Sequence, residues 1–311
     1  TIAAQPHGIN ASTLRGVYFR TSTVESTGTG VGAAAIIMNG TGTVTHGQDQ
    51  GIWMSTSAIA KSVDGDITMS GHGNVGFLWG SASITSTGSG DIHLIGERLP
   101  IGSNDIGHYG ATTITSGTGD IILELNTLFK GGDVSPSLQT TGGGRVFIVP
   151  RTAGTTIGIG GGSGTLQMTT ASLGFLQDGF SEIIIGNTTA GNITVNAATF
   201  TDSLRLVTAG NVAINGALDV GTNRLVLLPA GNTAQGAAII AGSLRLGWID
   251  SDGARRRPSA LPKHQPKGSK ADQGNWQRVL ANLAAQVRHE LAAAVSKELG
   301  PRLIDDSAER Q

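Results

Sequence analysis

The 311-residue sequence contains no cysteine, few aromatic residues and few charges. The lack of cysteine excludes disulfides and thiolate metal sites, so the fold must rest on core burial and backbone hydrogen bonds. Aromatic residues make up 4% and charged residues 14% of the chain, whereas charged residues make up about 25% of an average protein. No apolar run reaches the roughly 18 residues that a membrane-spanning helix needs, so none is predicted.

Glycine, in contrast, is abundant, with 48 residues, which is about twice its average share of roughly 7%. Ser, Thr, Asn, Val and Ile account for much of the rest. This composition favours short strands separated by tight turns over helices. The apolar residues are too regularly placed for a disordered Gly/Ser linker, so a folded β-protein is predicted.

The net charge of −1 conceals an asymmetry between the two parts of the chain. Residues 251–311 carry 11 Lys/Arg against 7 Asp/Glu, a net charge of +4, and the remaining 250 residues carry 10 against 15, a net charge of −5. A mildly acidic body argues against a nucleic-acid groove, so no nucleic-acid partner is expected.

One short motif recurs: a glycine, then Asp or Asn, then alternating β-forming residues. Its copies, one of them looser, begin at Gly65, Gly90, Gly119, Gly144, Gly191 and Gly210. The first three copies are 25 and 29 residues apart. A single such unit cannot bury its apolar face, whereas stacked units bury a continuous core.

The repeat therefore predicts an all-β fold, a parallel β-helix (solenoid). Imperfect 25–30-residue repeats cover residues 1–150, and the β-helix continues over residues 151–250. Alternation is expected to place Ile, Val, Leu and Met on one face and Thr, Ser and Asn on the other. Corner glycines are expected to supply positive φ or close backbone approach. A β-sandwich is the alternative, because short strands with frequent turns also describe it.

Several segments carry a family resemblance: Asp178–Phe180, Ile183–Gly186, Gly191–Val195, Ala198–Phe200 and Gly210–Leu218. The stretch that contains them resembles the repeat region of filamentous-haemagglutinin-like bacterial adhesins and exoproteins, and residues 16–125 resemble looser coils of the same proteins. The resemblance implies a right-handed parallel β-helix that forms the stalk of a large secreted protein. It also implies a location on the bacterial cell surface and attachment to a glycan or cell-surface receptor.

The family is exported through an outer-membrane secretion partner that recognises an N-terminal domain with an Asn-Pro-Asn-type motif. Neither that motif nor a signal peptide is found in this sequence, which begins with Thr1. We therefore expect a fragment whose export signal lies outside it, and the chain itself gives no support for the secretion partner.

The β pattern ends at Arg255–Pro258, and three predicted segments follow. Residues 251–274 are predicted to be a basic, proline-containing linker, residues 275–300 an amphipathic α-helix, and residues 301–311 a tail. The helix carries one apolar stripe: Trp276, Leu280, Leu283, Val287, Leu291 and Val295. This stripe could cap the solenoid, self-associate or bind a partner, and the sequence leaves these alternatives open.

Carboxylates are candidate catalytic groups because enzymes that cleave polysaccharides also use β-helices. Asp66, Asp91 and Asp120 occupy the same position of successive repeats, so we expect them at equivalent corners. Such a ladder could bind Ca²⁺. Asn takes the position at Asn192 and Asn211, however, and Asn cannot replace a general acid. We therefore interpret all five as repeat corner residues; Asp49 and Asp64 were the other candidates.

Two tryptophans form the candidate ligand platform. Trp53 and Trp79 are expected to hold matching positions of neighbouring units, after Gly51 and before Gly80. If exposed, they would offer stacking surfaces to sugar rings; if buried, they would fill a wide corner. The seven histidines show no metal-ligand spacing, and the dinucleotide-like stretch Gly71–Gly76 lacks a βαβ context. No catalytic, cofactor-binding or metal residue is predicted.

These observations favour a non-enzymatic, structural and adhesive segment of a secreted bacterial surface protein. The alternative is a β-helical polysaccharide lyase or depolymerase, which would need clustered acid and base residues in a cleft. A third interpretation is a scaffold whose active part lies in absent sequence.

Overall fold

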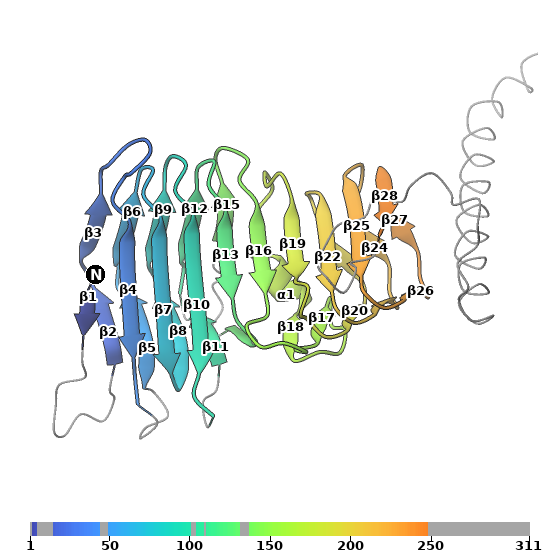
Figure 1. Ribbon diagram of the computed structural model, residues 1–311, viewed down its shortest axis with the longest axis horizontal. Helices are drawn as coiled ribbons and strands as arrows, with labels where there is room; N and C mark the ends of the chain where they lie inside the picture. Colours follow the sequence, from blue (N-terminus) through green and yellow to red (C-terminus); the bar gives the residue numbers. More distant parts are fainter. Residues whose placement is uncertain are drawn as a thin grey trace, which may run out of the picture. The chain divides into compact units, whose positions relative to one another are not determined.

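The computed structural model describes residues 2–4, 15–43, 49–100, 104–108, 110–130 and 137–247. These residues form parallel β-sheets and one short helix, α1 (Thr170–Leu173). Figure 1 shows the strands side by side along the chain. The all-β prediction is confirmed, and the arrangement is consistent with a parallel β-solenoid.

Sheet A is the longest ladder, with ten strands in sequence order. Its strands are β1 (Ile2–Ala4), β4 (Ile36–Thr41), β7 (Ile67–Gly73), β10 (Ile92–Arg98), β13 (Ile121–Glu124), β16 (Val146–Val149), β19 (Ile183–Gly186), β22 (Leu204–Thr208), β25 (Arg224–Pro229) and β28 (Ser243–Leu246). Every adjacent pair is parallel, so the chain returns to sheet A once in each turn.

Two further sheets complete the turns of the N-terminal half. Sheet B contains β2 (Arg15–Arg20), β5 (Gln50–Ser55), β8 (Val75–Gly80), β11 (Asn104–His108) and β14 (Leu128–Lys130). Sheet C contains β3 (Thr23–Ser26), β6 (Ile59–Ser62), β9 (Ser83–Ser86), β12 (Thr113–Ser116) and β15 (Ser137–Thr140). The chain thus visits A, B and C in rotation, and each strand pairs with its counterpart one turn later.

After β16 the two companion sheets are replaced, while sheet A continues. Sheet D contains β17 (Ile157–Ile159), β18 (Leu166–Met168), β20 (Ile193–Val195), β23 (Val212–Ile214) and β26 (Thr233–Gln235). Sheet E contains β21 (Ala198–Thr199), β24 (Leu218–Asp219) and β27 (Ile239–Ile240). The helix α1 lies in the enlarged turn at this change, between β18 and β19.

The core is built from columns of apolar side chains, and each turn contributes one residue to a column. In sheet A, Ile67 is in register with Ile92, and Ile92 with Ile121. All three are fully buried, and the column continues through Val146 and Ile183. Because each turn contributes one member to a continuous column, no turn buries its apolar face without its neighbours.

Glycines allow the backbones of sheets A and B to approach closely where the two sheets meet. A Cβ atom at Gly71 would lie 2.0 Å from the carbonyl oxygen of Gly76, and one at Gly76 would lie 2.3 Å from the backbone nitrogen of Glu97. Any side chain here would collide with backbone atoms. Close approach therefore explains these repeated glycines, and neither has a positive φ.

The interior also contains polar side chains, although serine was predicted to lie on the outer face. Ser62, Ser86 and Ser116 end consecutive strands of sheet C and are buried. The prediction was wrong for these residues. Each serine lies two positions after a core residue of the same strand, and alternation therefore points both side chains into the interior. In sheet C, for example, Ala60 and Ser62 are both buried.

The predicted linker (251–274), helix (275–300) and tail (301–311) lie outside the described residues. Within the part of the chain that is described, no helix is long and apolar enough to cross a membrane.

Candidate functional site

The three predicted corner aspartates form a hydrogen-bonded ladder at the corner that leads into sheet A, where each directly precedes a strand. The Asp66 carboxylate accepts the backbone N–H of Asp91 at 2.9 Å, and the Asp91 carboxylate accepts that of Asp120 at 2.7 Å. The Asp120 carboxylate accepts the backbone N–H of Arg145 at 2.8 Å and forms an ion pair with its guanidinium. Each carboxylate thus binds the next turn, and the hydrogen bond to Asp120 raises the pKa of Arg145.

The asparagines form a second ladder on a different sheet. Asn192 accepts the backbone N–H of Asn211 at 2.8 Å, and Asn211 accepts that of Asn232 at 2.7 Å. They precede strands of sheet D, whereas the aspartates precede strands of sheet A. The prediction that Asp and Asn occupy one repeated position was wrong. The two motifs look alike in the sequence because a side-chain oxygen makes the same contact at both corners.

Of the two other carboxylate candidates, Asp49 is buried and accepts a hydrogen bond from the Thr43 hydroxyl, and Asp64 also connects turns. It accepts the backbone N–H of Gly30 at 2.7 Å and that of Ser89 at 2.8 Å. These two donors lower the pKa of the Asp64 carboxyl. Among the described residues, no group of three or more His, Asp or Glu side chains is placed to hold a metal ion.

The two tryptophans do not occupy matching positions. In the pairing of β5 with β8, Trp53 is in register with Leu78, and Trp79 is in register with Met54. A shift of one residue moves a side chain to the other face of the sheet. Trp79 is therefore in the core, 1% exposed, with its ring 5.2 Å from that of Phe77, while Trp53 is half-buried on the outer face.

Trp53 is instead paired with a tyrosine. Tyr18 is its register partner in β2, and the two ring centroids are 5.0 Å apart. The Arg15 guanidinium lies 4.0 Å from the Trp53 centroid and 4.6 Å from the Tyr18 centroid. Its Nε donates to Gln50 Oε1 at 3.1 Å. We call Arg15, Tyr18 and Trp53 the aromatic–arginine cluster.

The electrostatics of this cluster are those of a partly desolvated cation over two aromatic faces. Burial lowers the pKa of the Arg15 guanidinium from its ordinary value, and interaction with Tyr18 opposes that shift. A guanidinium stacked on aromatic rings keeps its hydrogen-bonding edges free. The only sequence signal for the cluster was the pair of apolar runs at 16–19 and 51–54.

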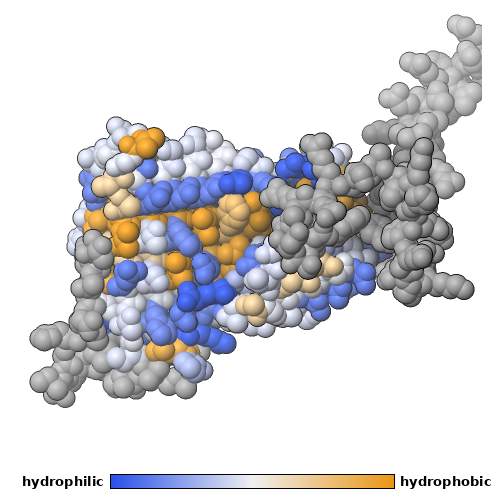
Figure 2. Space-filling view, in the orientation of Figure 1, coloured by the Kyte–Doolittle hydropathy of each residue, from blue (hydrophilic) through white to orange (hydrophobic). Residues whose placement is uncertain are grey.

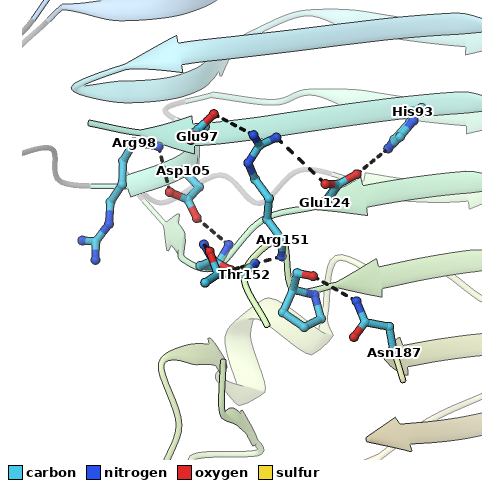
Figure 3. Close-up of polar contacts among 10 residues, drawn as sticks. His93, Glu97, Arg98, Asp105, Glu124, Arg151, Thr152 and Asn187 are labelled. Carbon is cyan, nitrogen blue, oxygen red and sulfur yellow. Dashed lines mark hydrogen bonds and ion pairs between the residues drawn. The ribbon is translucent and has the colours of Figure 1, made fainter. Parts of the chain in front are cut away.

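A second polar group lies on the outer face of sheet A and spans three turns (Figure 3). Arg151 Nη2 contacts Glu97 Oε2 at 2.7 Å, and Nη1 lies 3.9 Å from Glu124 Oε1. Glu124 in turn contacts His93 Nε2 at 3.2 Å. His93 lies on the outer face because it alternates with the buried Ile92 and Leu94, and its partners are far apart in the chain, so no local motif identifies them.

These two glutamates are held by Arg151, and their side chains are 30% to 44% exposed. The arrangement is an ion-pair network between turns. Beside it, the buried Asp105 accepts the backbone N–H groups of Arg98 at 2.9 Å and Thr127 at 3.0 Å. Both features stabilise the stacking of turns by contacts between them.

The outer face of sheet A also carries an apolar band. Figure 2 shows apolar residues gathered across the strands that face the viewer. Ile37 is 41% exposed, and Ile95, Ile122, Phe147 and Val149 are half-buried. The expectation that the outer face carries mainly Thr, Ser and Asn is therefore wrong for sheet A.

A groove of about 570 Å³ lies where α1 adjoins sheet E. Leu173, Leu176, Phe200 and Ile240 line it, together with the carboxylate-bearing Asp219. The groove occurs at the change of companion sheets, where Leu176 forms a bridge to the last strand of sheet C.

Comparisons with known proteins returned no relatives. No family model matches the sequence, and no curated protein and no solved structure matches it.

Proposed function

We propose that this chain is a non-enzymatic, adhesive segment of a secreted bacterial surface protein. In this proposal the sheets form a right-handed parallel β-helix that serves as a stalk and attaches to surfaces, to a host or to other cells. The carrying observation is the uninterrupted ten-strand ladder of sheet A, in which every turn pairs with the next. Stacked repeats of this kind build an extended rod and do not require a single active site.

The use of polar side chains supports this proposal. Asp66, Asp91 and Asp120 bind the backbone of neighbouring turns, and Glu97 and Glu124 contact Arg151 of a later turn. An acid–base catalyst needs its carboxylates directed at a substrate cleft. In the described residues these carboxylates are instead used between turns.

The segments that carry the family resemblance also support it. Gly191–Val195 and Gly210–Ile214 lead into β20 and β23, and Ile193 is in register with Val212. The same motif therefore occupies the same place in consecutive turns. We accordingly propose a location outside the cell or on its surface, with a glycan or cell-surface receptor as partner; export through an outer-membrane partner is proposed from the family resemblance alone.

A retention and cleavage assay tests this function against the enzyme alternative. The purified 311-residue chain would be incubated with bacterial, plant and host glycans, and bound material and chain length would be measured together. We expect retention of at least one glycan without cleavage. Cleavage that is lost in Glu97→Gln or Glu124→Gln would replace this proposal with a lyase or depolymerase, and failure to retain any glycan would remove the glycan-adhesive role.

A further inference from the structure

The aromatic–arginine cluster lies at a sheet edge. Arg15 and Tyr18 belong to β2, which is the edge strand of sheet B in the described part of the chain, and Trp53 belongs to the neighbouring strand, β5. Tyr18 is 43% exposed, and Trp53 is half-buried beside it. The outer face of sheet B therefore presents two adjacent aromatic rings at the point where its ladder ends.

Arg15 is held in place by uncharged groups. The two ring faces and the Gln50 amide fix its position. In the part of the chain that the structure describes, none of the ion pairs involves Arg15. Because Nε is already used, the terminal nitrogens remain as donors, and two such donors match the two oxygens of one carboxylate.

The cluster therefore combines two kinds of recognition at one place. A fixed guanidinium that has no acidic partner among the described residues favours a carboxylate ligand. Exposed aromatic surface next to it selects a rigid group with an apolar face, since aromatic rings gain most from flat contact area. A uronic acid carries both features, because its pyranose ring has a face of C–H groups and its carboxylate projects from the ring edge.

We propose that Arg15, Tyr18 and Trp53 form a binding site for a uronic-acid residue of an acidic polysaccharide. The carboxylate contacts the Arg15 terminal nitrogens, and the C–H face of the sugar lies against the exposed aromatic surface. This inference rests on the proposed adhesive function and names the ligand class and its site. A neutral glucan offers the ring without the charge, and an acidic peptide offers the charge without the rigid ring.

The test is a titration of the full 311-residue chain with three probes of matched length. These are an oligogalacturonate, a neutral malto-oligosaccharide and an oligoglutamate, followed by calorimetry and by tryptophan fluorescence. Arg15→Gln removes the charge, and Arg20→Gln is the matched control, because Arg20 is an exposed arginine on the same strand that contacts no ring among the described residues. Tyr18→Ala tests the aromatic surface at an exposed position.

We expect the oligogalacturonate to bind the wild-type chain and to perturb tryptophan fluorescence. Arg15→Gln should bind about ten-fold more weakly or worse, because it loses a charge-assisted hydrogen-bonded pair. Tyr18→Ala should bind several-fold more weakly, and Arg20→Gln should match the wild type within about two-fold. Far-UV circular dichroism of each variant confirms that the β-structure is retained.

Other results overturn the site in separable ways. Unchanged binding by Arg15→Gln, or an equal loss in Arg20→Gln, would remove this site while leaving glycan attachment intact. Equal binding of the neutral oligosaccharide would overturn the role of the carboxylate, and equal binding of oligoglutamate would overturn the role of the sugar ring. Absence of oligogalacturonate binding, with retention of another glycan, would overturn the inference but not the proposed function.

Discussion

The Asp91 carboxylate accepts the backbone N–H of Asp120, 29 residues later, at 2.7 Å. The Asp91 backbone N–H in turn donates to the Asp66 carboxylate. Each aspartate of the ladder is thus an acceptor toward the next turn and a donor toward the previous one. The contact between turns therefore uses a side-chain oxygen as the acceptor.

Two substitutions separate the role of this oxygen from that of the charge. Asp91→Asn keeps an acceptor oxygen and removes a charge next to Asp66 and Asp120, so its free energy of unfolding should stay within about 0.5 kcal/mol of the wild type. Asp91→Ala leaves the Asp120 N–H without its acceptor and should cost about 1 kcal/mol. Urea denaturation measures both values; an equal loss in the two variants would show that charge, and not the acceptor, is what matters.

Ser62 and Ser86 are register partners and form a second matched pair. Ser86 Oγ donates to the Val63 carbonyl at 3.1 Å, whereas Ser62 Oγ is buried without a hydrogen-bond partner among the described residues. Ser86→Ala should therefore lower the free energy of unfolding by about 1 kcal/mol, and Ser62→Ala should be neutral or stabilising. Thermal melts of the two variants side by side check this order, and the reverse order would contradict the contact assignment.

Glu182 is a buried carboxylate shared by two arginines. Its side chain is 6% exposed and lies 2.6 Å from Arg205 and 2.9 Å from Arg224. Glu182→Gln leaves the Arg205 charge, itself 16% exposed, without its partner and should cost about 3 kcal/mol or more. Arg224→Gln is the control: its side chain is 46% exposed, so its loss should cost about 1 kcal/mol or less. If chemical denaturation gave similar losses of unfolding free energy for Glu182→Gln and Arg224→Gln, the assignment of Glu182 and Arg205 as a buried ion pair would be contradicted.

Asp202 and Asp64 should respond to pH in opposite directions. Burial raises the pKa of the Asp202 carboxyl, with nearby Asp178 adding to the shift. A raised folded-state pKa means that stability is full below the unfolded-state pKa and is lost as pH rises through the folded-state pKa. Asp202→Asn should therefore be more stable than the wild type at neutral pH, and the difference should vanish as the solution is acidified.

Asp64 is the control of opposite sign. Its pKa is lowered by the N–H donors of Gly30 and Ser89, so its contribution is present above the unfolded-state pKa and is lost as pH falls through the folded-state pKa. Asp64→Asn should be less stable than the wild type at neutral pH and should converge with it in acid. Free energies of unfolding of the wild type and the two variants, measured from about pH 3 to 7, test both predictions. A variant whose curve runs parallel to that of the wild type would contradict the pKa shift assigned to that aspartate.

The sequence repeat was a reliable guide to the strands of sheet A. The motifs at Gly65, Gly90 and Gly119 lead directly into β7, β10 and β13, whose first residues are in mutual register. This worked because a strand that must match its neighbour one turn away keeps both its alternation and its corner residue. The same reasoning was wrong for the asparagine motifs. They lie at a different corner, before sheet D, where a side-chain oxygen also accepts a backbone N–H of the next turn.

The candidate site was less accessible from the sequence. Trp53 and Trp79 each follow a glycine in neighbouring repeats, but Trp53 lies two residues after Gly51 and Trp79 lies three residues after Gly76, and this one-residue difference in register separates the surface from the core. Tyr18 and Arg15 gave no motif of their own. Their contact with Trp53 depends on which strands are neighbours, and composition does not carry that information.

The sequence by itself determined the class of structure: short parallel strands in stacked turns, with Asp or Asn at corners, because these follow from alternation, turn chemistry and the need of each turn to be covered. Only the tertiary structure decided which side chains meet. The contact of Arg15 with Trp53, the sharing of Glu182 by Arg205 and Arg224, and the burial of Ser62 all join residues of different turns or depend on register. Register is fixed by the packing of the whole stack, so no single repeat contains it.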